Sequence, residues 1–147
     1  MTNAQLAELL ETGGHSLVVE NGAVRTFGGR GVKDLLRLLD EEPQALDGAR
    51  VADKVVGKAA AALMTLGKVA SVYAHTVSTP AVALLRQNGV EVEFAGEVHH
   101  IINRDGTGWC PMEKACRDLQ SPGEMLCAIK ETIAELAKRK QTESRTN

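Results

Sequence analysis

The dipeptide Asn21-Gly22 stands between two short apolar and β-branched runs, residues 17–20 and 23–27. Asn-Gly is strongly favoured in two-residue hairpin turns of type I′, because both central residues of that turn need positive φ angles. Strands joined by so short a turn must pair antiparallel. The sequence therefore predicts an antiparallel hairpin close to the amino terminus, which argues against an all-helical core.

Helical and extended patterns alternate around this hairpin. Apolar residues recur at helical spacing in most of the segments, whereas residues 69–75 are β-branched and apolar, as in a parallel strand covered on both faces. Residues 90–94 alternate strictly and predict a strand near a sheet edge. A short first helix is expected around Leu6, Leu9 and Leu10, after the possible caps Thr2 and Asn3 and before Gly13-Gly14. The other expected helices are 32–39, 54–66, 80–87, 111–117 and 124–138, with further extended pieces at 49–52 and 99–103. This order predicts an α/β fold, a mixed sheet of an antiparallel hairpin plus parallel strands, covered by helices.

The length of the chain, 147 residues, is that of one ordinary domain. Neither an internal repeat nor a linker interrupts the pattern of elements. We expect a single domain over residues 1–140 and a frayed polar tail over 141–147.

Charge and composition argue against several classes of partner. The net charge of −2 and the aromatic content of 3% provide neither a basic face nor a stacking platform for nucleic acid. There is no apolar stretch of about 18 residues to cross a membrane, and the first residues lack the pattern of a signal peptide. Three cysteines at irregular spacing do not make a disulfide framework. These features predict a cytoplasmic protein.

Two segments could bind an anion. Arg30 lies in Gly28-Gly29-Arg30-Gly31, between an expected strand and an expected helix, where backbone amides and the helix end attract negative charge. If Asp53 caps the helix 54–66, Lys54 and Lys58 are one turn apart at its positive end, an arrangement that an anionic ligand would stabilise. The alternatives are a plain connection at Arg30 and two solvated lysines.

Cys110-Pro111-Met112-Glu113 predicts the start of a helix, because proline suits the first helical position and places Cys110 at the cap. A partly exposed thiol there has a lowered pKa. Cys110 is then a nucleophile or redox thiol, the wall of a ligand pocket, or an inert cap. Glu113 falls at the third helical position, where its carboxylate could assist catalysis or reach back to the cap amide.

A metal centre is not expected from this sequence. His99, His100, Cys110 and Cys116 are the candidate donors, and their spacing matches no zinc pattern. No cofactor motif occurs either, since the glycine-rich segment is neither a P-loop nor a dinucleotide fingerprint.

Three segments together resemble a small bacterial family of unknown function with a cytidine-deaminase-like fold. They are Gly29-Arg30-Gly31-Val32, the run from Ala52 to Ala61, and Asn103-Arg104 followed by Cys110-Pro111-Met112-Glu113. The resemblance covers about residues 3–138. It implies the deaminase scaffold, in agreement with the order of elements given above.

The zinc chemistry of deaminases is not implied, because their metal-binding motifs are absent. Zinc deaminases need His-x-Glu at the start of one core helix and Pro-Cys-x-x-Cys at the start of the next. Here Val56 and Lys58 stand in the first motif, and Ala81 and Leu84 replace the two thiols of the second. We therefore expect no stoichiometric zinc and no cytidine deamination.

These observations favour a zinc-free deaminase-like domain that binds a small anionic or nucleotide-like ligand. One alternative is an enzyme of another reaction type that uses Cys110, assisted by Glu113 or Lys58; another is a protein-interaction subunit. The sequence leaves the oligomeric state open, a homo-oligomer included. The expected ligand-binding residues are Arg30, Asp53, Lys54, Lys58, Asn103 and Arg104, and the candidate catalytic residues are Cys110 and Glu113.

Overall fold

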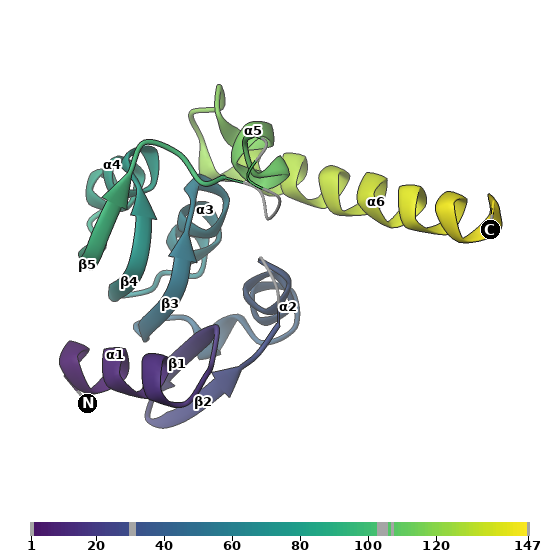
Figure 1. Cartoon of the computed structure of the whole chain (residues 1–147). Helices are drawn as coiled ribbons and strands as arrows, with labels where there is room; N and C mark the ends of the chain where they lie inside the picture. The colour runs from purple at the N-terminus through teal and green to yellow at the C-terminus, as the bar shows by residue number, and fades with distance from the viewer. Residues whose placement is uncertain (1, 30–31, 103–105, 107, 147) are drawn as a thin grey trace.

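The structure, a computed structural model, describes residues 2–29, 32–102, 106 and 108–146, with side chains through residue 140. Figure 1 shows a sheet with helices on both faces and a long helix that extends away from the body. The elements in chain order are α1 (Asn3–Thr12), β1 (Leu17–Asn21), β2 (Ala23–Phe27), α2 (Lys33–Glu41), a 3₁₀ turn (Pro43–Ala45), β3 (Arg50–Val56), α3 (Lys58–Leu66), β4 (Ser71–Ser78), α4 (Thr79–Gln87), β5 (Glu91–Val98), α5 (Pro111–Cys116) and α6 (Pro122–Thr146).

The five strands form one mixed sheet in the order β2-β1-β3-β4-β5. β1 pairs antiparallel with both β2 and β3, whereas β4 pairs parallel with both β3 and β5. The expected hairpin, the inner parallel strand and the edge position of β5 are thus confirmed. So is the α/β class with a mixed sheet flanked by helices.

The hairpin turn differs from type I′. Gly22 has a φ of 80°, but Asn21 remains in β1 and pairs with Ala23 across the turn. The side-chain amide nitrogen of Asn21 instead donates to the backbone carbonyl oxygens of Gln44, Ala45 and Asp47. Asn21 therefore ties the hairpin to the 3₁₀ turn, which is a contact that local turn propensity does not reveal.

The helices cover the two faces of the sheet unequally. Leu6 and Leu10 of α1 pack with Val18 and Ala52 on one face. The larger core on the other face takes its buried residues from the sheet and from α2, α3, α4, α5 and α6. No described helix is long and apolar enough to cross a membrane.

The boundary between β3 and α3 lies later than expected. The predicted helix over 54–66 begins only at Lys58, because β3 continues to Val56 and Gly57 is the N-cap residue. The β-branched pair Val55-Val56 suits a strand, and the alanine run that favours a helix starts at residue 59. Asp53 is therefore a strand residue and not a helix cap.

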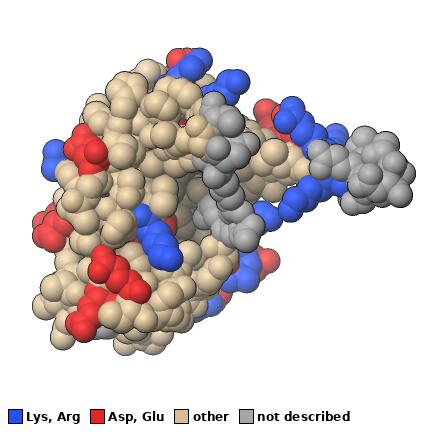
Figure 2. All heavy atoms as spheres, in the orientation of Figure 1, with Lys and Arg blue, Asp and Glu red and all other residues tan. Residues whose placement is uncertain are grey.

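The last helix is longer than expected. α6 continues to Thr146, whereas the sequence predicted a helix that ends at 138. Met125 and Ile129 in its first half are fully buried, but Leu136 is exposed. Figure 1 shows the second half of α6 projecting from the body, and Figure 2 shows Lys and Arg side chains along the described part of this projection. The extended segment expected at 99–103 contains only an isolated bridge between Ile102 and Trp109 among its described residues.

Candidate functional site

Two helices begin side by side at the carboxyl ends of the parallel strands β3 and β4. Gly57 follows β3 and caps α3, while Ser78 ends β4 and caps α4 by accepting a hydrogen bond from the backbone N–H of Ala81 at 3.3 Å. Ligands of open α/β sheets bind at the carboxyl ends of the strands. The helix N-termini also bring partial positive charge to this edge.

The carboxylate of Glu113, from α5, occupies the space between these two helix starts. Its Oε1 accepts a hydrogen bond from Ser78 Oγ at 3.0 Å, and both carboxylate oxygens lie 3.3 Å from the backbone nitrogen of Lys58. Only 2% of Glu113 is exposed. We call Gly57, the Lys58 N–H, the Ser78 hydroxyl and the Glu113 carboxylate the Glu113 slot.

Gly57 makes the Glu113 slot possible. A Cβ atom built on Gly57 would collide with Glu113 Oε2 and would also press on Ile101. Any side chain at position 57 therefore competes with the carboxylate for the same space. This is a steric requirement, since the backbone of Gly57 is in an extended conformation open to other residues.

Burial raises the pKa of Glu113 above its ordinary value. Hydrogen bonds from Ser78 and from backbone N–H groups act in the opposite direction, as does the nearby His100. The neighbouring Cys116 thiol is fully buried, and its pKa is raised to about 11, so it is protonated at neutral pH. Cys116 therefore offers no thiolate to this site.

One prediction was that the Glu113 carboxylate reaches back to the cap amide of its own helix, and the structure shows no such hydrogen bond. The Cys110 backbone N–H donates to the carbonyl oxygen of Ile101 at 2.8 Å, leaving the carboxylate to serve α3 and α4. Cys110 does occupy the N-cap of α5 with Pro111 in the first turn, and it is half-buried. Its role as a nucleophile or redox thiol stays a prediction.

Lys58 joins the Glu113 slot through its backbone and not through its ammonium group. Lys58 Nζ donates to the carbonyl oxygens of Arg117 and Leu119, at 3.0 and 2.7 Å, just after α5. Lys54 is an exposed residue of β3 whose backbone N–H donates to Ser16 O. The prediction that Lys54 and Lys58 share one helical face is therefore wrong.

Asp53 is buried in β3, with 8% exposure. Its pKa is raised from 3.8 to about 7, chiefly by burial, against which backbone hydrogen bonds from Val55 and Lys54 act. The carboxylate of Asp34 adds to the rise and itself accepts a hydrogen bond from Gly29 N. Arg30, Asn103 and Arg104, which the sequence placed in an anion site, lie outside the described residues.

A stack of side chains lies close to the Glu113 slot. The rings of His100 and Trp109 are parallel within 7°, with centroids 4.1 Å apart, and the Arg117 guanidinium lies 5.4 Å from the Trp109 centroid. Sequence reasoning treated His100 only as a metal ligand and did not find this stack. It also missed Ser78, although a serine just before Thr79-Pro80 is a recognisable N-cap signal.

Comparison with known proteins identifies a family whose function is described as unknown. No curated protein matches the sequence. A solved structure, the DUF1893 family protein TM1506 from Thermotoga maritima, is similar with a TM-score of 0.80 and 25% identity, over 89% of this chain and 92% of that chain. The family model described as "Domain of unknown function (DUF1893)" matches residues 5–133. The chain therefore belongs to the DUF1893 family.

Proposed function

We propose that this protein is a metal-independent binding domain of deaminase-like architecture, which takes a small anionic or nucleotide-like ligand at the carboxyl ends of β3 and β4. The strand order, with an antiparallel hairpin beside three parallel strands joined through α3 and α4, supports the deaminase-like part. The positions that would hold zinc, Val56, Ala81 and Leu84, are buried apolar side chains without metal donor atoms.

One observation supports the choice of an anionic ligand: the donors of the Glu113 slot already converge on a carboxyl group. A backbone N–H at the start of α3 and a hydroxyl at the start of α4 converge on the carboxylate. Helix N-termini bind phosphate and carboxylate groups through such donors. In the ligand-free chain Glu113 acts as an internal competitor, and an incoming phosphate or carboxylate takes its place.

The stack next to the slot supports a planar group on the ligand. His100 and Arg117 cover the two faces of Trp109, so a planar group would add to the outer side of His100 or of the Arg117 guanidinium. Stacking of a base on aromatic or guanidinium planes stabilises binding by roughly 1–3 kcal/mol. A nucleoside monophosphate joins both features, with its phosphate in the slot and its base at the stack.

The test is to empty the slot with Glu113→Ala and titrate it with acetate, inorganic phosphate, cytidine 5′-monophosphate and cytidine. Trp109 is the only tryptophan of the chain, so its fluorescence reports on binding close to the site. We expect phosphate and the nucleotide to bind the variant at least about tenfold more tightly than the wild type, because the internal competitor is gone. Cytidine alone should gain nothing.

Two further measurements make the result decisive. In the Glu113→Ala background, Ser78→Ala should reverse the gain, since it removes a donor of the slot. Where Glu113→Ala reduces the folded fraction, acetate should restore it by refilling the slot. A folded variant that binds every anion as weakly as the wild type, or an unfolded variant that acetate does not rescue, overturns the proposal.

A further inference from the structure

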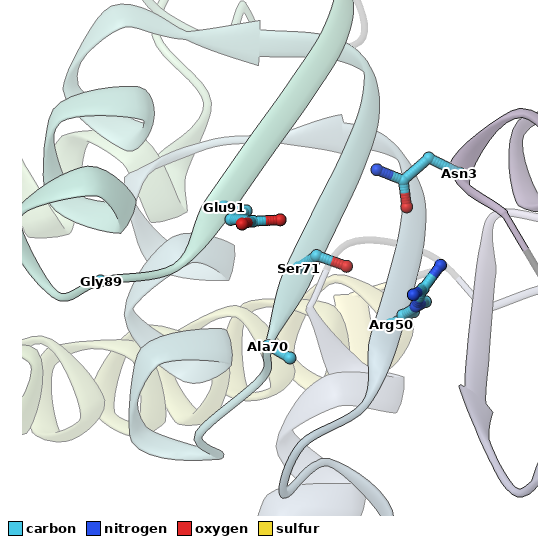
Figure 3. Close-up of a pocket in the computed structure, with 6 residues that line it drawn as sticks. All are labelled: Asn3, Arg50, Ala70, Ser71, Gly89 and Glu91. Atoms are coloured by element: carbon cyan, nitrogen blue, oxygen red, sulfur yellow. The ribbon is translucent and has the colours of Figure 1, made fainter.

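One face of the sheet is covered only in part. α1 packs on this face through Leu6 and Leu10, and Tyr73 of β4 lies at the margin of the contact. A hollow of about 410 Å³ lies between Asn3, at the start of α1, and Glu91, at the start of β5 (Figure 3). Parallel strands are normally covered on both faces. Among the described elements, no second helix covers the β5 side of this face.

The uncovered part of the face is acidic. Tyr73 and Glu93 are neighbours across β4 and β5, so Glu93 shares the face on which α1 packs. Glu93 is exposed, as are His75 and Ala95 further along the same two strands. Burial raises the pKa of Tyr73, and the charge of Glu11 on α1 adds to the rise, so this ring lies between two carboxylates. We call Tyr73, His75, Glu93 and Ala95 the open face.

The apolar stripe of α6 runs past the body of the molecule. Ile129, Ile133, Leu136 and the stem of Lys140 follow at spacings of four, three and four residues, so they lie on one side of the helix. Ile129 is fully buried, whereas Ile133 is half-buried and Leu136 is 37% exposed. Arg139 and Lys140 are exposed, and neither makes an ion pair among the residues that the structure describes.

The open face and the projecting half of α6 cannot meet within one molecule. The buried half of α6 packs with α3 and α5 on the opposite face of the sheet. From there the helix leads away from the sheet (Figure 1). Figure 2 shows acidic side chains over α1 and the neighbouring edge of the sheet, and basic side chains along α6. A second copy of the chain therefore offers the surface that the projecting half can reach and whose charge it complements.

We propose that two copies of the chain exchange the projecting halves of α6, each of which docks on the open face of the other copy. The apolar stripe of the helix then covers Tyr73 and Ala95, while Arg139 and Lys140 approach Glu93. The helix occupies the place that a second helix beside α1 would take in a sheet covered on both faces.

Charges of both signs are matched in this arrangement. Lys54 of β3 is exposed near the open face, and Glu135 lies one turn before Arg139 on α6 and offers it a carboxylate. The contact is small, so we expect a weak pair with a dissociation constant on the order of 100 µM. The chain is then a monomer in the more dilute solutions used to measure unfolding.

Sedimentation equilibrium of the full-length chain tests the proposal between about 10 µM and about 1 mM, a range that brackets the expected dissociation constant. We expect a monomer that converts to a dimer, and a weaker dimer at high salt, which screens the charges. Glu93→Lys, or Arg139→Glu together with Lys140→Glu, should weaken the pair at least about tenfold, because like charges then face each other. Glu41→Lys is the matched control, since Glu41 is exposed on α2 at the opposite face.

A mixture of the two weakened proteins separates docking from misfolding. The open face of Glu93→Lys then meets the acidic helix end of the double variant, and the two unchanged surfaces also match. We expect a heterodimer in the mixture at concentrations where each variant alone is a monomer. A wild type that stays monomeric throughout the range, growth beyond a pair, equal weakening by Glu41→Lys and Glu93→Lys, or a mixture that stays monomeric would each overturn the proposal.

Discussion

Gly57 lies directly beneath the Glu113 carboxylate, so the two residues should be energetically coupled. Gly57→Ala places a methyl group where Glu113 Oε2 now lies, and overpacking of this kind costs about 1–3 kcal/mol. In a Glu113→Ala background the same substitution should cost much less, since the colliding atoms are absent. Urea unfolding of the four proteins of this double-mutant cycle measures the coupling.

Gly28→Ala is the matched control for this cycle. A Cβ at Gly28 meets nothing within 4 Å, so we expect a change within about 0.5 kcal/mol. An equal cost of Gly57→Ala with and without Glu113 would show that the steric account of the slot is wrong.

Asp53 should make stability depend on pH. Its pKa is about 7 in the folded chain against 3.8 for an ordinary aspartate. The folded state therefore holds a proton that the unfolded state has lost. Between these two pKa values stability falls as the pH rises, by about 2–3 kcal/mol from pH 5 to pH 8 for this group. Asp53→Asn should remove this share of the fall, as measured by urea unfolding at both pH values.

Glu113 contributes to the same pH dependence with the same sign, because its pKa is also raised. The Asp53 contribution is thus the difference between wild type and Asp53→Asn, and not the whole slope. If the stability of Asp53→Asn falls with pH as steeply as that of the wild type, the pH dependence does not come from Asp53.

At the scale of elements, Lys58 connects the start of α3 to the chain just after α5. Lys58→Met keeps the aliphatic stem but removes the donors to Arg117 O and Leu119 O. We expect a loss of about 1–2 kcal/mol. Lys54→Met is the control, since Lys54 is exposed on β3, and it should change stability by less than about 0.5 kcal/mol. Thermal unfolding compares the stability of the two variants. Equal losses would show that the Lys58 hydrogen bonds do not hold α3 to the chain after α5.

Local patterns predicted most of the elements, because each of these elements has its own periodicity or turn signal. The hairpin, the inner strand β4 and the edge strand β5 are examples. The start of α3 was predicted wrongly because apolar residues 55, 56, 59 and 60 fit a helical face as well as a strand followed by a helix. The β-branched pair Val55-Val56 favours the strand only weakly, and the pairing of β3 with its neighbours in the sheet decides the ambiguity.

The Glu113 slot could not be predicted in this way. Glu113 lies 55 residues from Lys58 and 35 from Ser78 in sequence. The sequence did single out Cys110-Pro111 and Glu113 as the start of a helix, and that start is confirmed. What it could not provide was the partner of the carboxylate, because the partner is set by how α5 packs on the sheet.

At the scale of the whole molecule, the second half of α6 should be dispensable for folding. Side chains described beyond residue 136 are exposed, and the family model ends at residue 133. Deletion of residues 138–147 should therefore change the free energy of unfolding by less than about 0.5 kcal/mol. Ile129→Ala, on the buried half of the same helix, should cost about 2–5 kcal/mol. Urea unfolding measures both, and a large loss on truncation would show that the projecting half supports the body.

The long sequence separation of Glu113 from its partners affects the order in which the chain assembles. The parallel strands are joined one after the other through α3 and α4, so their contacts close comparatively short loops. The contact between Glu113 and Lys58 closes a loop of 55 residues and needs both helices already in place. Contacts formed after the rate-limiting step change the unfolding rate and leave the folding rate almost unaffected. We therefore expect Glu113→Ala to raise the unfolding rate and to leave the folding rate almost unchanged, so that Glu113 lengthens the lifetime of the folded molecule.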